Sequence, residues 1–177
     1  MKLLLEITDK DVNDGSVERF DKPYRLRKAA RAVVFNNKNE IAFQFVSKHN
    51  YHKLPGGGVE KGETTFEALE REVLEETGYK IKVGKEIGAI LEYRNEFNVL
   101  QISYCYLAKA EEKISEPNYE KEEIEGGFQP LWLPIDEAIK LLENDNPTTY
   151  DGRFIVKRDL CFLKEIKFMA IIKKNYE

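Results

Sequence analysis

Three glutamates, Glu72, Glu75 and Glu76, recur at helical spacing in one acidic stretch of this chain. An α-helix turns about 100° per residue, so their side chains fall within an arc of roughly 100°. Like charges at this spacing repel each other by about 0.2–0.5 kcal/mol per pair. Clustered carboxylates are the ligands that hard divalent cations such as Mg²⁺ prefer, and a dication would relieve the repulsion. The spacing therefore predicts a metal site on this helix.

The alternative is an acidic helix face that is simply solvated, which is the usual meaning of a Glu-rich helix. Such faces normally carry Lys or Arg at the i+4 positions, whereas here Arg71 alone offsets the surrounding glutamates. The segment "HKLPGGGVEKGE" before the helix is also unusually rich in glycine, and glycine lets a backbone pass close to a ligand. Both observations favour the metal site over the solvated face.

The helix that carries these carboxylates has clear boundaries. Thr64 predicts the N-cap, with Glu67 three residues later completing a capping box. Gly78 suits the position that ends the helix. Phe66, Leu69 and Val73 fall within about 60° on the helical wheel, so we expect this stripe to face the core. The carboxylates would then converge beside the buried face.

The rest of the chain reads as strands followed by helices. Residues 27–37 and 40–48 predict a β-hairpin, 6–24 predicts loops or a short peripheral strand, and 111–127 predicts an acidic loop. Strand patterns also cover 80–94, 98–110 and 128–134, and helix patterns cover 135–144 and about 151–174. This order predicts a mixed β-sheet with helices packed on it, in an α/β or an α+β fold. At 177 residues, the chain is expected to form a single domain, 1–177.

Residues 57–79 resemble the signature of the Nudix hydrolases, G-x5-E-x7-R-E-U-x-E-E-x-G-U, where U is a bulky aliphatic residue. Gly57, Glu63, the Arg71–Glu72 pair, the Glu75–Glu76 pair and Gly78 occupy every fixed position. Tyr79 departs from the aliphatic residue of the last position, but it can fill a core position equally well. The resemblance implies an α/β/α sandwich and a MutT-like hydrolase that cleaves phosphoric anhydride bonds with Mg²⁺ or Mn²⁺.

The resemblance also implies roles for individual residues. Glu72, Glu75 and Glu76 would be the metal ligands, helped by the carbonyl of Gly57. Arg71 would hold the loop and helix together by an ion pair with Glu63 or Glu75. Members of the family differ in their general base. Glu72 is the first choice within the signature, and the alternatives outside it are Glu122, Glu123 and Glu125.

Substrate contacts are less clearly marked than metal ligands. The basic and aromatic residues near the signature are candidates for phosphate or base contacts, although each has an ordinary surface or core role as its alternative. The candidates that we retain are His52, Lys53, Arg31 and Tyr93. The implied substrate is a small nucleoside diphosphate derivative. A nucleoside triphosphate pyrophosphohydrolase is the leading interpretation, and ADP-ribose, nucleotide sugars and dinucleoside polyphosphates are the alternatives.

Two interpretations from other functional classes stay open. A Nudix-type domain can sense a nucleotide without catalysis, and such domains often lose a carboxylate of the signature, which this chain keeps. A protein-binding domain with a vestigial site is the other.

The formal net charge of −4 argues against nucleic acid as a partner. No apolar run is long enough to cross a membrane, and Cys105 and Cys161 sit in apolar contexts, so we expect a cytoplasmic protein with reduced thiols. A homodimer paired through the N-terminal segment 1–11 is a further possibility.

Overall fold

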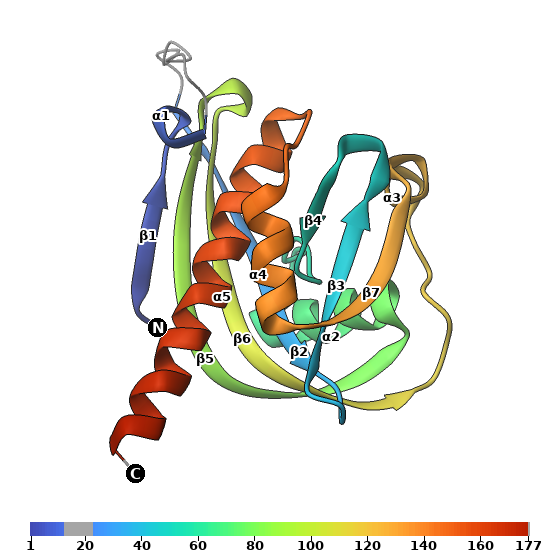
Figure 1. Cartoon of the computed structure of the whole chain (residues 1–177). Coiled ribbons are helices and arrows are strands. Elements are labelled where there is room, and N and C mark those ends of the chain that lie inside the picture. The colour runs from blue at the N-terminus through green and yellow to red at the C-terminus, as the bar shows by residue number, and fades with distance from the viewer. Residues whose placement is uncertain (13–22, 177) are drawn as a thin grey trace.

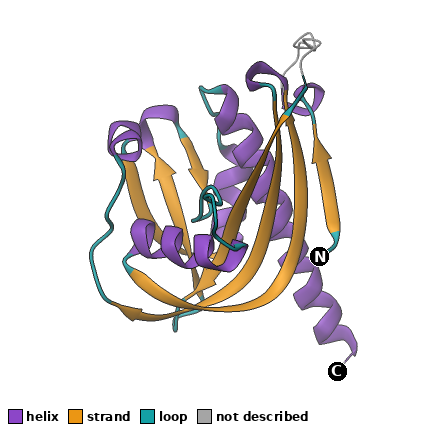
Figure 2. Cartoon of the chain, turned by 180° about the vertical axis from the view of Figure 1, so that it is seen from behind, coloured by secondary structure: helices purple, strands orange, loops and turns teal. Residues whose placement is uncertain are grey.

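A seven-stranded mixed sheet with helices on both faces forms the protein (Figures 1 and 2). The computed structural model describes residues 1–12 and 23–176. The strands are β1 (Leu3–Ile7), β2 (Arg25–Phe35), β3 (Glu40–Val46), β4 (Tyr51–Lys53), β5 (Tyr79–Arg94), β6 (Val99–Lys113) and β7 (Phe128–Pro134). The α-helices are α1 (Asp9–Val12), α2 (Thr65–Thr77), α3 (Lys121–Gly126), α4 (Ile135–Asn144) and α5 (Tyr150–Tyr176). The predicted α/β fold is confirmed.

The strands follow the order β1-β5-β6-β2-β3-β4, and β7 pairs with β3. The β1–β5 and β2–β6 pairs are parallel, and the other pairs are antiparallel. The N-terminal strand β1 thus lies at the edge of its own sheet, where one side pairs with β5 (Figure 1). The segment proposed to pair between subunits therefore also pairs within the chain. Residues 13–22 of the predicted polar stretch 6–24 lie outside the described residues.

The sheet opens between β2 and β3. These strands form the predicted hairpin, yet Phe35 and Ile41 are their only register pair among the described residues. Beyond that pair, the edge of β2 is taken by the glycine loop. The amide of Ala32 donates to the carbonyl of Pro55, and the amide of Ala30 donates to that of Gly57. The loop therefore lies directly against β2, at the point where the sheet divides.

Two hydrophobic cores lie on opposite faces of the sheet. Helix α2 covers one face, where Leu69 and Val73 pack against small residues of β2 such as Ala30. Helices α4 and α5 cover the other face, where Phe154 and Phe162 pack with Val33. Figures 1 and 2 show α2 and the α4–α5 pair on opposite sides. Because side chains alternate along a strand, β2 supplies both cores from successive residues.

Helix α2 has the caps that its sequence predicts. The side chain of Thr64 accepts from the amide of Glu67, and the side chain of Glu67 accepts from the amide of Thr64. Gly78 ends the helix with φ of 77°. The predicted apolar stripe is wrong at one position: Leu69 and Val73 are buried, but Phe66 is 47% exposed. Phe66 lies in the first turn of α2, where its ring contacts Tyr106 of β6 on one side only.

The segment 111–127 is not simply the acidic loop that its composition predicts. Strand β6 extends through Lys113, and α3 occupies Lys121–Gly126. The helix has its own capping box between Glu120 and Glu123, and Gly127 follows with φ of 69°. Local capping thus stabilises a short helix within an acidic composition. Across the described ranges, no helix combines the length and hydrophobicity that crossing a bilayer requires.

Candidate active site

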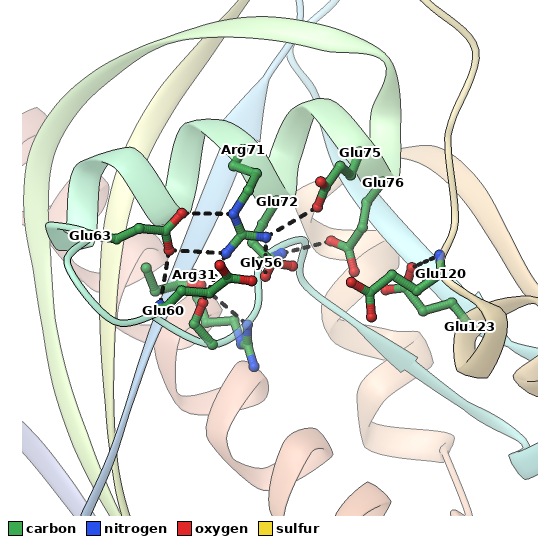
Figure 3. Close-up of polar contacts among 12 residues, drawn as sticks. Arg31, Gly56, Glu60, Glu63, Arg71, Glu72, Glu75, Glu76, Glu120 and Glu123 are labelled. Atoms are coloured by element: carbon green, nitrogen blue, oxygen red, sulfur yellow. Dashed lines mark hydrogen bonds and ion pairs between the residues drawn. The ribbon is translucent and has the colours of Figure 1, made fainter.

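Arg71 lies at the centre of the acidic face of α2 (Figure 3). Its Nε donates to Glu63 Oε1 at 2.8 Å, and its Nη1 donates to Glu72 Oε1 at 2.9 Å and to Glu75 Oε2 at 3.2 Å. Its Nη2 donates to the carbonyl of Gly58 at 3.2 Å. The bonds from Arg71 lower the pKa of Glu63 to about 2. One guanidinium thus connects two points of the preceding loop, Gly58 and Glu63, to the helix, and it also pairs with Glu75 of the helix itself.

Glu76 lies deeper than the other carboxylates of α2 and is 1% exposed. Its Oε1 accepts from Lys53 Nζ at 2.5 Å, and its Oε2 accepts from the amide of Gly56 at 2.7 Å. Lys53 also lies 3.4 Å from the carbonyl of Gly56 and 5.0 Å from the ring centre of Phe128. A buried carboxylate needs such partners because burial of an unpaired charge is costly. This ion pair joins β4, the glycine loop and α2.

The glycine loop approaches its neighbours so closely that side chains do not fit. A Cβ atom on Gly57 would lie 2.1 Å from Glu72 Oε2, and one on Gly56 would lie 2.2 Å from the carbonyl oxygen of Ala30. Gly56 also has φ of 127°, a conformation that L-residues rarely adopt. The carbonyl of Gly57 accepts from the amide of Ala30 at 3.0 Å. The run of glycines therefore brings backbone within contact of the acidic face.

Helix α3 adds further carboxylates to this region. Figure 3 shows Glu120 and Glu123 beside Glu76. Burial raises the pKa of Glu123 to about 6, the negative charge of Glu76 adds to this effect, and a bond from the amide of Glu120 opposes it. Burial also raises the pKa of Glu75, and Arg71 opposes that shift. Carboxylates from two separate elements are thus held together against their mutual repulsion.

The donor chemistry of this region fits a divalent cation, because its carboxylates and glycine carbonyls are hard oxygen ligands. Among the described residues, however, no group of three acidic, His or Cys side chains is arranged to hold a metal ion as it stands. The ion pairs explain this, since Arg71 occupies Glu72 and Glu75 while Lys53 occupies Glu76. A cation would therefore have to use the second oxygens of Glu72 and Glu75, which Arg71 does not contact, and to displace Lys53 from Glu76.

The structure brings two of the four candidate substrate residues to this region. Lys53 contacts Glu76, and Arg31 lines a cavity next to the glycine loop. His52 instead bonds through Nδ1 to Asp145 at 2.8 Å and stacks between Phe43 and Phe45. Tyr93 lies edge-on against Tyr24, on the face of β5 opposite to its neighbour Arg94. Neither of these two is among the residues that line the cavity.

Sequence reasoning missed part of the cavity. Its lining includes Arg25 and Arg27 as well as Arg31 and Arg94. The signal was present in the sequence, because arginines at 25, 27 and 31 keep the two-residue period of a strand and so share one face of β2. Phe128 also lines the cavity, and its contact with Lys53 depends on β7, which is distant in sequence.

Comparisons with known proteins agree with this geometry. A model of the NUDIX domain family matches residues 25–152. Human diphosphoinositol polyphosphate phosphohydrolase 3-alpha is 27% identical over 128 residues, covering 71% of this chain and 74% of that protein. Nudix hydrolase 6 of Arabidopsis thaliana is 31% identical over 148 residues, covering 80% of this chain and 50% of that protein. The crystal structure of a MutT protein from Methanosarcina mazei Go1 superposes with a TM-score of 0.54 at 20% identity, covering 84% and 99% of the two chains, and shares the fold.

Proposed function

The chain belongs to the Nudix family, and from this premise we propose that it uses Mg²⁺ or Mn²⁺ to hydrolyse a nucleoside diphosphate linked to a further group. Its family membership makes it a hydrolase that acts on pyrophosphate bonds. The observation that carries the metal-dependent proposal is the acidic face of α2. Glu72, Glu75 and Glu76 lie there beside the glycine loop, and Glu123 of α3 and its N-cap residue Glu120 lie next to them (Figure 3).

In this proposal, Glu72, Glu75 and Glu76 hold the cation together with a carbonyl of the glycine loop. The family resemblance implies the carbonyl of Gly57, which already accepts one hydrogen bond from the amide of Ala30. The carbonyl of Gly56 is an equal candidate, because it lies beside Lys53, the partner of Glu76. When bound, the cation neutralises phosphate oxygens and lowers the pKa of a bound water.

The remaining chemistry falls to residues of the chain. Water attacks one phosphorus atom, the bond from that phosphorus to the bridging oxygen breaks, and the oxygen leaves with the other phosphate. Glu123 is the candidate base, because its pKa of about 6 lets it accept the proton of water near neutral pH. Glu72 is the alternative from within the signature. Arg71 acts as a positioning residue, since its bonds fix Glu72 and Glu75.

Among substrates, a nucleoside triphosphate remains our first proposal, with pyrophosphate and a nucleoside monophosphate as products. ADP-ribose, nucleotide sugars and dinucleoside polyphosphates are the alternatives. A non-catalytic nucleotide sensor is the alternative of another class, and the complete set of signature carboxylates speaks against it.

The free thiols of Cys105 and Cys161 support the proposed cytoplasmic location. We also keep a homodimer as a proposal.

Replacing Glu75 by Gln tests the proposed metal site. Removal of groups that merely support metal ligands costs about 10- to 100-fold in activity, so loss of a ligand should cost at least that much. The assay is release of phosphate or pyrophosphate, with Mg²⁺, from a panel of nucleoside triphosphates, nucleotide sugars and dinucleotides. EDTA should abolish the activity of the wild-type protein on every member of the panel.

Glu70→Gln is the matched control, since Glu70 is an exposed glutamate of the same helix and makes no ion pair within the described part of the chain. It should hydrolyse at the wild-type rate, while thermal melting confirms that both variants are folded. Equal rates for Glu75→Gln and the wild type would show that the metal site is wrongly assigned.

A further inference from the structure

Four arginines line one cavity of about 410 Å³ next to the glycine loop. Arg25, Arg27 and Arg31 come from one face of β2, and Arg94 comes from β5. The cavity lies on the face of β2 that also carries Val33, and Asp151 and Ile155 of α5 line it as well. We call it the arginine cavity. Its volume suits a small organic group with several substituents.

The positive charge of the arginine cavity exceeds the negative charge that lines it. Of its two acidic residues, Asp151 is already paired with Arg94, which Glu92 balances as well. Glu122 is exposed on α3 and has no ion pair among residues 1–12 and 23–170. Within that same part of the chain, Arg25 and Arg27 have no acidic partner at ion-pair distance. Arg27 instead donates to Gln101.

Arg31 is the most informative of these side chains. It is 5% exposed, and its single hydrogen bond in the described structure runs from Nη1 to the carbonyl of Ala30 at 3.2 Å. Its Nε is buried without a partner. Burial, with the nearby charges of Arg158 and Arg27, lowers the pKa of Arg31 to about 10, although Asp159 and Glu76 oppose this shift. A buried cation whose counter-charges lie beyond ion-pair distance is costly, and a bound anion would offset that cost.

The arginine cavity adjoins the acidic face of α2. Phe128 lines the cavity and also contacts Lys53, which is paired with Glu76. Arg27 lies against Gly58, where a Cβ atom would be 3.0 Å from Nη2. A substrate whose diphosphate lies over the carboxylates can therefore extend its remaining part into the arginine cavity.

We propose that the arginine cavity binds a second anionic group of the substrate, so that the group attached to the scissile diphosphate itself carries phosphates. This inference rests on the proposed function and narrows its substrate class. A neutral nucleoside or sugar would leave Arg25, Arg27 and Arg31 without an acidic partner at ion-pair distance in the described part of the chain. A phosphorylated group would give each guanidinium a charge-assisted hydrogen bond. Neighbouring phosphates can accept these hydrogen bonds whether they are linked in a polyphosphate chain or attached to a ring.

The test measures binding without catalysis, by titration calorimetry in EDTA. Without divalent cations the carboxylates repel polyanions, so binding reports on the arginine cavity. The probes are inorganic tripolyphosphate and inositol hexakisphosphate, with adenosine as the uncharged comparison. The wild-type protein should bind at least one polyanion, and more tightly than adenosine. Arg25→Ala and Arg31→Met should each weaken that binding by about tenfold or more.

Two controls separate this inference from the proposed function. Lys82→Ala removes an exposed cation of β5 outside the arginine cavity and should bind the polyanions like the wild type. Glu75→Gln should keep polyanion binding although it loses hydrolysis. Arg25 is exposed, so Arg25→Ala should fold normally. It therefore tests the inference even if Arg31→Met fails to fold. Unchanged polyanion affinity in Arg25→Ala and in folded Arg31→Met would overturn the inference, as would adenosine binding as tightly as the polyanions.

Discussion

The carboxyl group of Glu123 should keep its proton to an unusually high pH in the metal-free protein. Its pKa of about 6 is raised above the ordinary 4.5 by burial and by the charges of Glu76 and Glu72, against Lys53 and a bond from the amide of Glu120. A raised carboxyl pKa means that the folded state binds more protons than the unfolded state between these values. Stability from this group is thus present below pH 4.5 and lost as pH rises through 6.

In EDTA, we therefore expect Glu123→Gln to be more stable than the wild type at pH 7 but not at pH 4. The difference should be about 1 kcal/mol, since the half-exposed carboxyl is screened by solvent. Urea denaturation at several pH values measures it. Glu125→Gln, which alters an exposed carboxyl of the same helix, should follow the wild type. A Glu123→Gln curve parallel to the wild type from pH 4 to 7 would contradict the raised pKa.

At the scale of residues, local spacing predicted the acidic face but not its partners. Glu72, Glu75 and Glu76 share a side of α2 because helix geometry is regular. The ion pair of Glu76 with Lys53 joins residues on different elements, so no local pattern could reveal it. His52 shows the same difficulty, because its partner Asp145 is 93 positions away. Proximity in sequence to the glycine loop did not bring its side chain to the cavity.

At the scale of elements, α2 should depend measurably on its N-cap. Thr64 accepts from the amide of Glu67 at 3.2 Å, and replacing it by Ala leaves that donor without its partner. Such a loss costs about 1 kcal/mol. We expect Thr64→Ala to lower the free energy of unfolding by this amount in urea denaturation. The exposed mid-helix change Glu70→Gln should stay within about 0.5 kcal/mol of the wild type. If both variants match the wild type, the capping box adds nothing to stability.

Elements with strong local signals were predicted well, and α3 was not. The caps and core residues of α2, the hairpin strands and the long C-terminal helix all follow from periodicity and end signals. Helix α3 is too short for periodicity to reveal it, and its capping box of Glu120 and Glu123 lies within a uniformly acidic run. Phe66 was placed in the core because a helical wheel gives the side of the helix on which a residue lies, but not how completely its neighbours cover it.

At the scale of the whole molecule, a buried charge network joins the sheet to α5. Arg158, Glu92 and Asp159 are all fully buried. Arg158 bonds to Asp159 at 2.7 Å and lies 3.6 Å from Glu92, while Asp159 accepts from the amide of Leu54. Burial alone would raise the pKa of Glu92, but Arg158 and Arg94 outweigh it and hold the pKa at about 2. The network links β5, α5 and the segment that follows β4.

Arg158→Met should therefore destabilise the whole fold. Removing one partner from a buried ion pair leaves the other charge without compensation, which costs about 3–5 kcal/mol. Chemical denaturation measures the loss. Lys157→Met is the control, because its ion pair with Asp11 at 3.7 Å is partly exposed and should be worth about 1 kcal/mol or less. Similar losses of stability in the two variants would mean that a buried ion pair contributes no more to stability here than an exposed one.

The order of strands and helices predicted the fold class, but three features of the whole molecule depend on contacts between distant segments. These are the parallel pairing of β1 with β5, the opening of the sheet between β2 and β3, and the burial of Arg158. Each joins segments that no local pattern connects. The second of these places the glycine loop along β2, where Gly58 lies against Arg27 of the arginine cavity.

The geometry of Arg71 has a consequence for tolerance to mutation. Its guanidinium makes bonds in several fixed directions at once, to Glu63, Glu72, Glu75 and the carbonyl of Gly58. A lysine carries the same charge on a single nitrogen and cannot reproduce that planar fork. Arg71→Lys therefore keeps the positive charge but loses most of these hydrogen bonds. In a library of variants, this position should accept arginine and little else.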